Sequence, residues 1–298
     1  MLEEYRKQGE KVRSVVELIR KLSSSLENIK IMNFCGTHEW TVVHYGLRSL
    51  MPKNVELIAG PGCPVCVTPS FAVEEAIRLS FEGVRIYTFG DAFRLPALRA
   101  VNGSKSLYEA KANGGMVEVV YSFPDALKGN GSEEKVFFGI GFETTAPSYA
   151  IPFARGMVPK DFYFLSVLRL TPPAADYALD KVGRVSGIIA PGHVSTVTGA
   201  GPWRTISERY SLPVVISGFE PLDVLISIAL ILKMIREGRA GLEIEYRRAV
   251  REEGNPLARK YMDEVFEKEE AAWRGIGIIP DSGMAVKYEE YDAYVRYS

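Results

Sequence analysis

Short apolar runs rich in β-branched and aromatic residues alternate with helical patterns along most of this chain. Such alternation is typical of a parallel α/β sheet, because each crossover between parallel strands carries a helix. Eight runs are predicted strands, over residues 29–33, 55–59, 84–89, 117–121, 135–140, 162–168, 187–190 and 213–217. Helical patterns cover residues 70–81 and 221–237, and an entry helix is predicted over about 12–26.

A turn-rich stretch, Lys128-Gly-Asn-Gly-Ser132, divides the predicted strands into two groups of four. A length of 298 residues suits two modest domains or one large one. We therefore expect two similar parallel-sheet α/β domains, residues 1–131 and 132–240. From Leu242 the sequence becomes charged and a helix is predicted over 256–272, so residues 241–298 are expected to form a mainly helical C-terminal appendage.

Charge and hydropathy exclude several classes of protein. The 36 Lys and Arg residues nearly balance the 37 Asp and Glu residues, which is unlike the basic surface of a nucleic-acid-binding protein. No apolar run approaches the ~20 residues that span a bilayer, and the charged segment Met1–Lys7 lacks the apolar core of a signal peptide. We therefore expect a cytoplasmic protein that binds neither nucleic acid nor membrane. Cysteines in that compartment more often serve catalysis, redox chemistry or metal binding than structural disulfides.

One cysteine stands between a predicted strand and a predicted helix. Cys35 follows the run 29–33 and precedes the polar residues Thr37-His38-Glu39, where a helix is expected to begin. The positive end of a helix dipole favours the thiolate, which is the nucleophilic and metal-binding form. His38 is near enough in sequence to hydrogen-bond to Cys35 or to share a metal with it. The alternative is that His38 is simply a polar residue of the first helical turn.

The other two cysteines form a C-x-x-C motif, Cys63-Pro64-Val65-Cys66, after the predicted strand 55–59. Prolines stiffen this loop, and the glycines before Cys63 permit tight turns. Two thiols at this spacing can close a disulfide or bind one metal. A structural zinc site is the alternative, since Cys35, His38, Cys63 and Cys66 make a Cys3His set. Such sites, however, are usually found on small domains rather than on a large sheet.

Polar loops follow three later strands, and ligands of open parallel sheets bind at the carboxyl ends of strands. Glu143, Thr144 and Thr145 follow the run 135–140, His193 follows 187–190, and Ser217–Pro221 follows 213–217. Together they predict a ligand-binding cleft, although each loop is also compatible with an ordinary turn and helix cap. Gly139-Ile-Gly141 begins like a dinucleotide fingerprint, but Thr144 stands where the third glycine belongs.

Five motifs in this order resemble the HypD family of hydrogenase maturation proteins: Cys-Gly-Thr-His-Glu at 35–39, Gly-Pro-Gly-Cys-Pro-Val-Cys at 60–66, Gly-Phe-Glu-Thr-Thr-Ala-Pro at 141–147, Pro-Gly-His-Val-Ser at 191–195 and Ser-Gly-Phe-Glu-Pro at 217–221. The resemblance implies a scaffold, working with a HypC-like chaperone and a HypE-like cyanide donor, on which the Fe(CN)2CO unit of [NiFe]-hydrogenase is built. It further implies that Cys35 is the iron ligand, His38 a nearby polar participant, and Cys63 with Cys66 the redox-active dithiol.

The sequence departs from the family in one respect. Family members usually continue past a segment like Trp273–Pro280 into a cysteine-rich region that binds a [4Fe-4S] cluster, whereas this chain has no cysteine after Cys66. A four-iron cluster normally takes four thiolates, so we expect none in this chain. The residues alone also allow a thiol–disulfide oxidoreductase, with Cys63 and Cys66 as the active pair and Cys35 as a resolving thiol. Whether the protein is an enzyme in the strict sense stays open.

Overall fold

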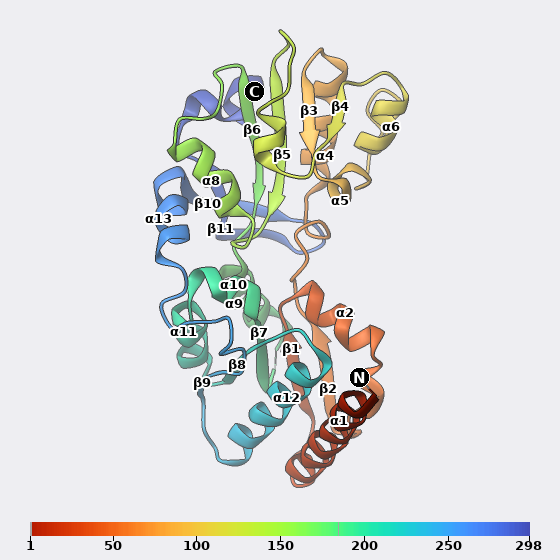
Figure 1. Cartoon of the computed structure of the whole chain (residues 1–298), viewed down its shortest axis with the longest axis vertical. Coiled ribbons are helices and arrows are strands. Elements are labelled where there is room, and N and C mark those ends of the chain that lie inside the picture. The colour runs from red at the N-terminus through yellow and green to blue at the C-terminus, as the bar shows by residue number, and fades with distance from the viewer. Residues whose placement is uncertain (1, 184) are drawn as a thin grey trace. The chain divides into compact units, whose positions relative to one another are not determined.

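The computed structural model describes residues 2–183 and 185–298 (Figure 1). The chain forms two compact units, and each combines two separate stretches of sequence. Unit 1 comprises Met1–Gly62 and Ala174–Pro256, and unit 2 comprises Cys63–Pro173 and Leu257–Ser298. Each unit contains its own parallel β-sheet flanked by helices. The predicted α/β class with two parallel sheets is therefore confirmed.

Unit 1 is built on a five-stranded parallel sheet. In spatial order its strands are β2 (Val55–Ala59), β1 (Ile29–Asn33), β7 (Gly187–Pro191), β8 (Pro213–Ser217) and β9 (Gly241–Ile244). The helices are α1 (Leu2–Ser23), α2 (Gly36–His44), α3 (Leu47–Leu50), α10 (Gly192–Thr198), α11 (Gly201–Tyr210) and α12 (Pro221–Arg236), with most of α9 (Thr171–Val182). The three central strands, β1, β7 and β8, end side by side, which brings the loops after them to one edge.

The sheet of unit 1 is apolar on both faces, because successive strand residues point to opposite sides. Ile31, Ile189 and Val215 are buried with residues of α1 and α12. Their neighbours Ile188 and Val214 are buried on the other side with residues of α9 and α11, including Trp203. Burial on both faces explains why these strands read as nearly continuous apolar runs.

Unit 2 has a four-stranded parallel sheet and an antiparallel hairpin. The spatial order of the parallel strands is β4 (Val117–Val119), β3 (Arg85–Thr88), β5 (Lys135–Gly141) and β6 (Phe162–Leu168). The hairpin consists of β10 (Phe266–Trp273) and β11 (Gly277–Val286). The helices are α4 (Ser70–Phe81), α5 (Gly90–Phe93), α6 (Leu107–Ala112), α7 (Phe123–Ala126), α8 (Ala146–Ala154), α13 (Pro256–Val265) and α14 (Ala293–Tyr297), with a 3-10 turn at Glu289–Tyr291.

The two faces of the unit 2 sheet differ in chemistry. Val136 and Phe138 of β5 lie in a largely aliphatic core with α4. Phe137, between them in sequence, lies on the opposite face among aromatic rings, with the ring centroid of Phe123 5.0 Å away. On the same face the rings of Tyr149 and Phe164 are also 5.0 Å apart. The strand pattern predicted β5 correctly but did not distinguish these two kinds of core.

The structure divides the chain differently from the predicted halves 1–131 and 132–240. The expected boundary at Lys128–Ser132 lies inside unit 2, between α7 and β5, while the chain changes unit after Gly62, Pro173 and Pro256. The reason is pairing across a long sequence separation, since Ile31 of β1 is in register with Gly187 of β7. Local strand patterns carry no information about such pairing.

The C-terminal region also differs from the mainly helical appendage that we expected for 241–298. The helix predicted over 256–272 ends at Val265, and the next residue starts β10. The charged segment Glu267–Glu270 has a helical composition, but its pairing with β11 and the burial of Phe266, Ala271 and Trp273 favour a strand. The edge strand β9 was not predicted either. In the described part of the chain, no helix has the length and apolar character needed to span a membrane.

Candidate functional site

Cys35 stands at the junction predicted for it, between β1 and α2. Asn33 ends the strand, Phe34 is buried, and Cys35 is the N-cap residue of α2 with an extended backbone (φ −146°). Its side chain makes no capping hydrogen bond, and it is a free, partly exposed thiol. Its sulfur is therefore not engaged by the helix that it precedes.

The backbone around Cys35 is held by the glycine-rich loop after β2. Gly62 O accepts a hydrogen bond of 2.8 Å from Gly36 N, and Gly60 N donates to Asn33 O at 2.7 Å. A Cβ on residue 62 would lie 2.4 Å from Cys35 N and 2.4 Å from the carbonyl carbon of Phe34. Only glycine allows this approach of two backbones, and the contact fixes the strand-to-helix turn that carries the thiol.

His38 is fully buried in the first turns of α2, and only one of its ring nitrogens has a partner. Nε2 lies 2.9 Å from Gly218 O and, facing a carbonyl, carries the hydrogen. Nδ1 is buried without a hydrogen-bond partner among the described residues. Burial lowers the pKa of His38 from 6.5 to about 4, and the backbone hydrogen bonds at Gly218 and Ser217 only partly oppose it. The ring is thus neutral at physiological pH and keeps a free lone pair on Nδ1.

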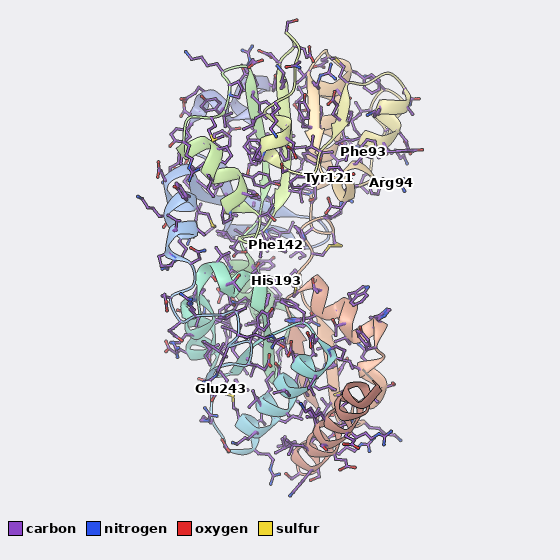
Figure 2. The ribbon with its side chains drawn as sticks, viewed as in Figure 1. Phe93, Arg94, Tyr121, Phe142, His193 and Glu243 are labelled. Carbon is purple, nitrogen blue, oxygen red and sulfur yellow. A yellow bond between two sulfur atoms is a disulfide. The ribbon has the colours of Figure 1, made fainter. Side chains whose placement is uncertain are left out.

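His193 approaches the same place from the end of β7. It is exposed in the first turn of α10 (Figure 2), and its ring stacks on Phe219 with centroids 3.8 Å apart. The ring of His38 also stacks on Phe219, at 4.7 Å. Burial lowers the pKa of His193. The structure therefore brings together the loops after β1, β7 and β8, as their neighbouring places in the sheet require.

The residues next to Phe219 form a polar network that the sequence motifs did not predict. Gly218 N donates to Glu245 Oε2 at 2.9 Å, and Tyr246 packs edge-on against Phe219 with centroids 5.7 Å apart. Asp223 takes part in the capping box of α12 and forms an ion pair with Arg248. Glu245, Tyr246 and Arg248 follow β9, so the failure to predict this strand also hid their position. The Glu220–Asp223 spacing was the available signal for the cap.

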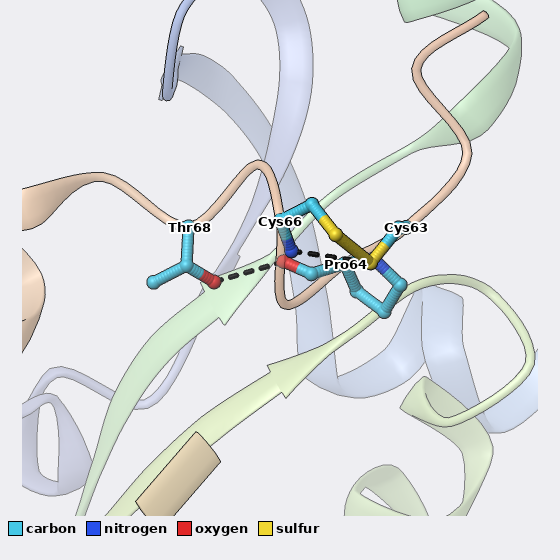
Figure 3. Close-up of a disulfide and its surroundings, with 4 residues drawn as sticks. All are labelled: Cys63, Pro64, Cys66 and Thr68. Carbon is cyan, nitrogen blue, oxygen red and sulfur yellow. Dashed lines mark hydrogen bonds between the residues drawn. A yellow bond between two sulfur atoms is a disulfide. The ribbon is translucent and has the colours of Figure 1, made fainter. Parts of the chain in front are cut away.

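Cys63 and Cys66 belong to unit 2 and are joined by a disulfide, with their Cα atoms 5.3 Å apart (Figure 3). The loop is a compact turn, in which Cys66 N lies 3.2 Å from Cys63 Sγ and Thr68 Oγ1 donates to Pro64 O at 2.9 Å. Cys66 is exposed and Cys63 partly buried. The turn thus holds the two cysteines close enough for a disulfide, and Cys66 is accessible to solvent.

Glu143, Thr144 and Thr145 also lie in unit 2, after β5. The Glu143 side chain is buried, and its two oxygens accept hydrogen bonds from Thr171 N at 2.8 Å and Thr171 Oγ1 at 2.9 Å. Burial raises the pKa of Glu143 from 4.5 to about 7. The side chain therefore contacts the first residue of α9, a contact that the sequence did not reveal. Thr144 is exposed, and Thr145 is the N-cap residue of α8.

Potential metal ligands are sparse in the described part of the chain. It contains no group of three or more His, Cys, Asp or Glu side chains arranged to hold a metal ion. In unit 1, the free thiol of Cys35 and the buried, unpartnered Nδ1 atom of His38 are a soft and a borderline donor on the same helix start. Any metal held there needs further ligands from elsewhere.

Comparison with known proteins matches almost the whole chain to one family. The family model described as HypD, hydrogenase formation hypA family, covers residues 10–298. This chain belongs to the HypD family. A putative hydrogenase expression/formation protein of Methanocaldococcus jannaschii is 40% identical over 95% of the chain and 80% of its own length. The HypD maturation factor of Cupriavidus necator is 37% identical over 99% of the chain and 81% of its own length. The HypD maturation factor of Rhodobacter capsulatus is 39% identical over 95% of the chain and 77% of its own length.

Membership of the HypD family makes the chain a hydrogenase maturation factor and confirms the resemblance of the five motifs. Three of these motifs, those with Cys35, His193 and Phe219, meet at the sheet edge of unit 1. The motif with Glu143 belongs to unit 2. The motif at 60–66 spans the change of unit, since Gly62, which contacts Cys35, lies in unit 1, and Cys63 and Cys66 lie in unit 2. The motifs thus form two chemically different groups, a thiol with imidazoles and a dithiol with a buried acid.

Proposed function

We propose that this protein is a cytoplasmic scaffold for assembly of the Fe(CN)2CO unit of [NiFe]-hydrogenase. Iron is its cargo, and Cys35 is the residue that binds it. His38 and His193 assist as polar neighbours, and Cys63 with Cys66 forms a redox-active dithiol. The binding of the cofactor intermediate by Glu143, Thr144 and Thr145 stays a prediction.

The observation that carries the proposal is the free thiol of Cys35 at the start of α2, in the same turn as a buried imidazole with an unpartnered Nδ1. Iron with strong-field diatomic ligands is low-spin and soft, and thiolate is a suitable ligand for it. The backbone contact between Gly62 and Gly36 supports a fixed position for this thiol. A neutral His38, with Nε2–H bonded to Gly218 O, offers a nitrogen lone pair and no repelling charge.

The dithiol role rests on a separate observation, the short Cα–Cα separation of 5.3 Å in the C-x-x-C turn. When the reduced pair closes its disulfide, two S–H bonds are lost, and two electrons and two protons pass to an acceptor. Because Cys66 is exposed, an external thiol can reopen the bond by attack on a sulfur atom. The pair can therefore be recharged without a cluster in the same chain.

Cys35 alone leaves an iron ion short of ligands, so we infer that a HypC-like chaperone supplies the rest and that a HypE-like protein delivers cyanide. The partner must reach the start of α2. Trp40 and Val43, three residues apart on the same helix, have 56% and 64% of their surface exposed, and adjacent exposed apolar side chains are typical of an interaction site. In size-exclusion chromatography with a purified HypC-like chaperone, Trp40→Ala should weaken the complex. Leu257→Ala, 60% exposed in unit 2, is the matched control; an equal effect of both would place the interface elsewhere.

The decisive experiment measures iron and infrared absorption in the cyanide and CO stretching region, on protein purified without oxygen after co-expression with its partners. Cys35→Ala should lose both while keeping its fold. Cys63→Ala should keep its iron-binding capacity and lose reversible disulfide formation. Iron and infrared bands in Cys35→Ala at the wild-type level would reject Cys35 as the ligand.

A thiol–disulfide oxidoreductase is the second candidate, favoured by the closed Cys63–Cys66 pair itself. It predicts thiol exchange with protein substrates, no bound iron, and loss of activity in Cys63→Ala and Cys66→Ala. A structural Cys3His zinc site predicts one zinc per chain and protection of all three thiols from alkylation. Metal analysis together with alkylation of the wild-type protein separates these outcomes from the scaffold.

A further inference from the structure

The last two residues of β10 and the residue after them contact three different loops of unit 2. The Arg169 guanidinium donates from Nε and Nη2 to Ala272 O, at 3.2 and 3.0 Å. The ring of Trp273 stacks on Phe142, with centroids 5.9 Å apart. Arg274 N donates to Val67 O at 2.8 Å. The end of this strand therefore meets the loops after β6 and β5 and the C-x-x-C turn.

The C-x-x-C turn is held partly by its own hydrogen bonds. Val67 N donates to Cys63 O at 3.2 Å, and Thr68 Oγ1 donates to Pro64 O at 2.9 Å. These bonds shape the turn but do not attach it to the rest of unit 2. The turn is attached by the hydrogen bond from Arg274 N to Val67 O, one residue after Cys66, and by the packing of Val65 against the core of unit 2.

The Arg274 side chain contacts a second segment, the loop after α5, which is itself hydrogen-bonded to the start of α4. Nη2 donates to Pro96 O at 2.7 Å. Two residues later, Leu98 N donates at 2.6 Å to Oγ of Ser70, the first residue of α4. Ser70 in turn donates to Glu74, and this bond, with a smaller contribution from the charge of Arg274, lowers the pKa of that carboxyl. Arg274 thus supports the segment at Val67 and at the helix that follows it.

We propose that Arg274 is a positioning residue for the Cys63–Cys66 dithiol. It keeps the turn in the conformation that sets the two Cα atoms 5.3 Å apart, so the closed disulfide is favoured over a freely moving dithiol. This inference rests on the redox role given to the pair under the proposed function. In exchange with glutathione, the pair loses two electrons and two protons as its S–S bond forms, and one oxidised glutathione is cleaved to two reduced glutathiones.

The test is an equilibrium titration of the full-length protein in a glutathione redox series, with thiol alkylation and mass spectrometry of the C-x-x-C peptide. Arg274→Met removes the Pro96 contact, and we expect the equilibrium constant for disulfide formation to fall about tenfold, or about 30 mV for a two-electron couple. Arg274→Lys keeps the positive charge but lacks the planar guanidinium group. In this variant the equilibrium constant should fall less. Arg155→Met is the matched control, since Arg155 lies at the end of α8 over the Tyr261 ring, 6.0 Å from its centroid.

The outcomes separate this inference from the proposed function. Reversible exchange in the wild type with the same constant in Arg274→Met as in Arg155→Met would overturn the positioning role alone. No reversible exchange in the wild type would overturn the redox role and this inference with it. If Arg274→Met fails to fold, as judged by near-ultraviolet circular dichroism, the folded Arg274→Lys protein decides, and a constant equal to the control overturns the proposal.

Discussion

The two units share an architecture and differ in the titratable group that each buries at the end of its sheet. Unit 1 buries an imidazole, His38, and unit 2 buries a carboxyl, Glu143. Neither side chain has an ion-pair partner in the described part of the chain, so burial drives both toward their neutral forms. The pKa of His38 falls to about 4, and that of Glu143 rises to about 7. One physical cause thus gives the two units opposite responses to pH.

The largest effect should come from Glu143. Its pKa is 4.5 before burial and about 7 in the folded protein, so the folded state binds more protons between these values. The free energy of unfolding of unit 2 should therefore fall as pH rises from 4.5 to 7, by about 3 kcal/mol from this group. Glu143→Gln keeps an oxygen for Thr171 N and should remove this slope. The charge of Lys268 opposes the shift only weakly.

Urea unfolding followed by Trp273 fluorescence, in a background lacking Trp40 and Trp203, reports on unit 2 because Trp273 is then the only tryptophan. Glu270→Gln, an exposed carboxylate of β10, is the matched control and should retain the wild-type slope. An unchanged slope in Glu143→Gln would show that Glu143 does not cause the pH dependence of unit 2.

The opposite slope is expected in unit 1 and has a similar size. With the pKa of His38 at 6.5 before burial and about 4 in the fold, the unfolded chain binds more protons between pH 4 and 6.5. The free energy of unfolding should therefore fall as pH drops through this window, by about 3 kcal/mol in metal-free protein. His193, which lowers this pKa, and Asp223, which raises it, are the nearby charged groups.

His38→Gln keeps a donor for Gly218 O and should flatten the acid slope, measured by Trp203 fluorescence in a background lacking Trp40 and Trp273. His44→Gln removes an imidazole from the exposed end of the same helix and serves as the control. A slope that persists in His38→Gln and disappears in His44→Gln would show that His44, and not His38, causes the acid response.

A smaller effect on stability is expected at the turn that carries Cys35, and it tests the close contact of this turn with Gly62. Gly62→Ala introduces a Cβ 2.4 Å from Cys35 N, a contact with backbone that no rotamer change relieves. We expect a loss of about 1–3 kcal/mol from the stability of unit 1, as for other overpacked sites. Gly201→Ala, where a Cβ meets nothing within 4 Å, is the matched control and should change stability by less than about 1 kcal/mol. Equal unfolding midpoints for the two variants would show that the backbone of the turn can move to accommodate the added Cβ atom at little cost.

The same contrast between local and long-range information separates what the sequence could predict from what it could not. Strands such as 162–168 and 213–217 were predicted to the residue, because strands buried on both faces have continuous apolar runs. The sheet to which each strand belongs depends on contacts such as Ile31 with Gly187, far apart in sequence. β10 was missed because its exposed Glu and Lys residues are as common in helices.

The candidate site follows the same rule. The position of Cys35 before a helix was predicted from neighbouring residues, and the structure confirms it. The contact of Glu143 with Thr171 and that of Glu245 with Gly218 join separate loops, so only the fold reveals them. The motif around Glu143 was recognised, whereas the direction of its side chain was not.

The last prediction concerns the cysteines of both units together, and it is that no iron–sulfur cluster forms on this chain. The 298-residue chain has three cysteines, one in unit 1 and two in unit 2, whereas a [4Fe-4S] cluster normally takes four thiolates. Reconstitution of this polypeptide with iron and sulfide under anaerobic conditions should therefore give near-zero acid-labile sulfide and no broad visible absorbance. Cys35→Ser should give the same result, while Cys63 and Cys66 stay open to an external reductant. About four irons and four sulfides per chain would require non-cysteine ligands or paired chains, and the separate roles given to the three thiols would have to be redrawn.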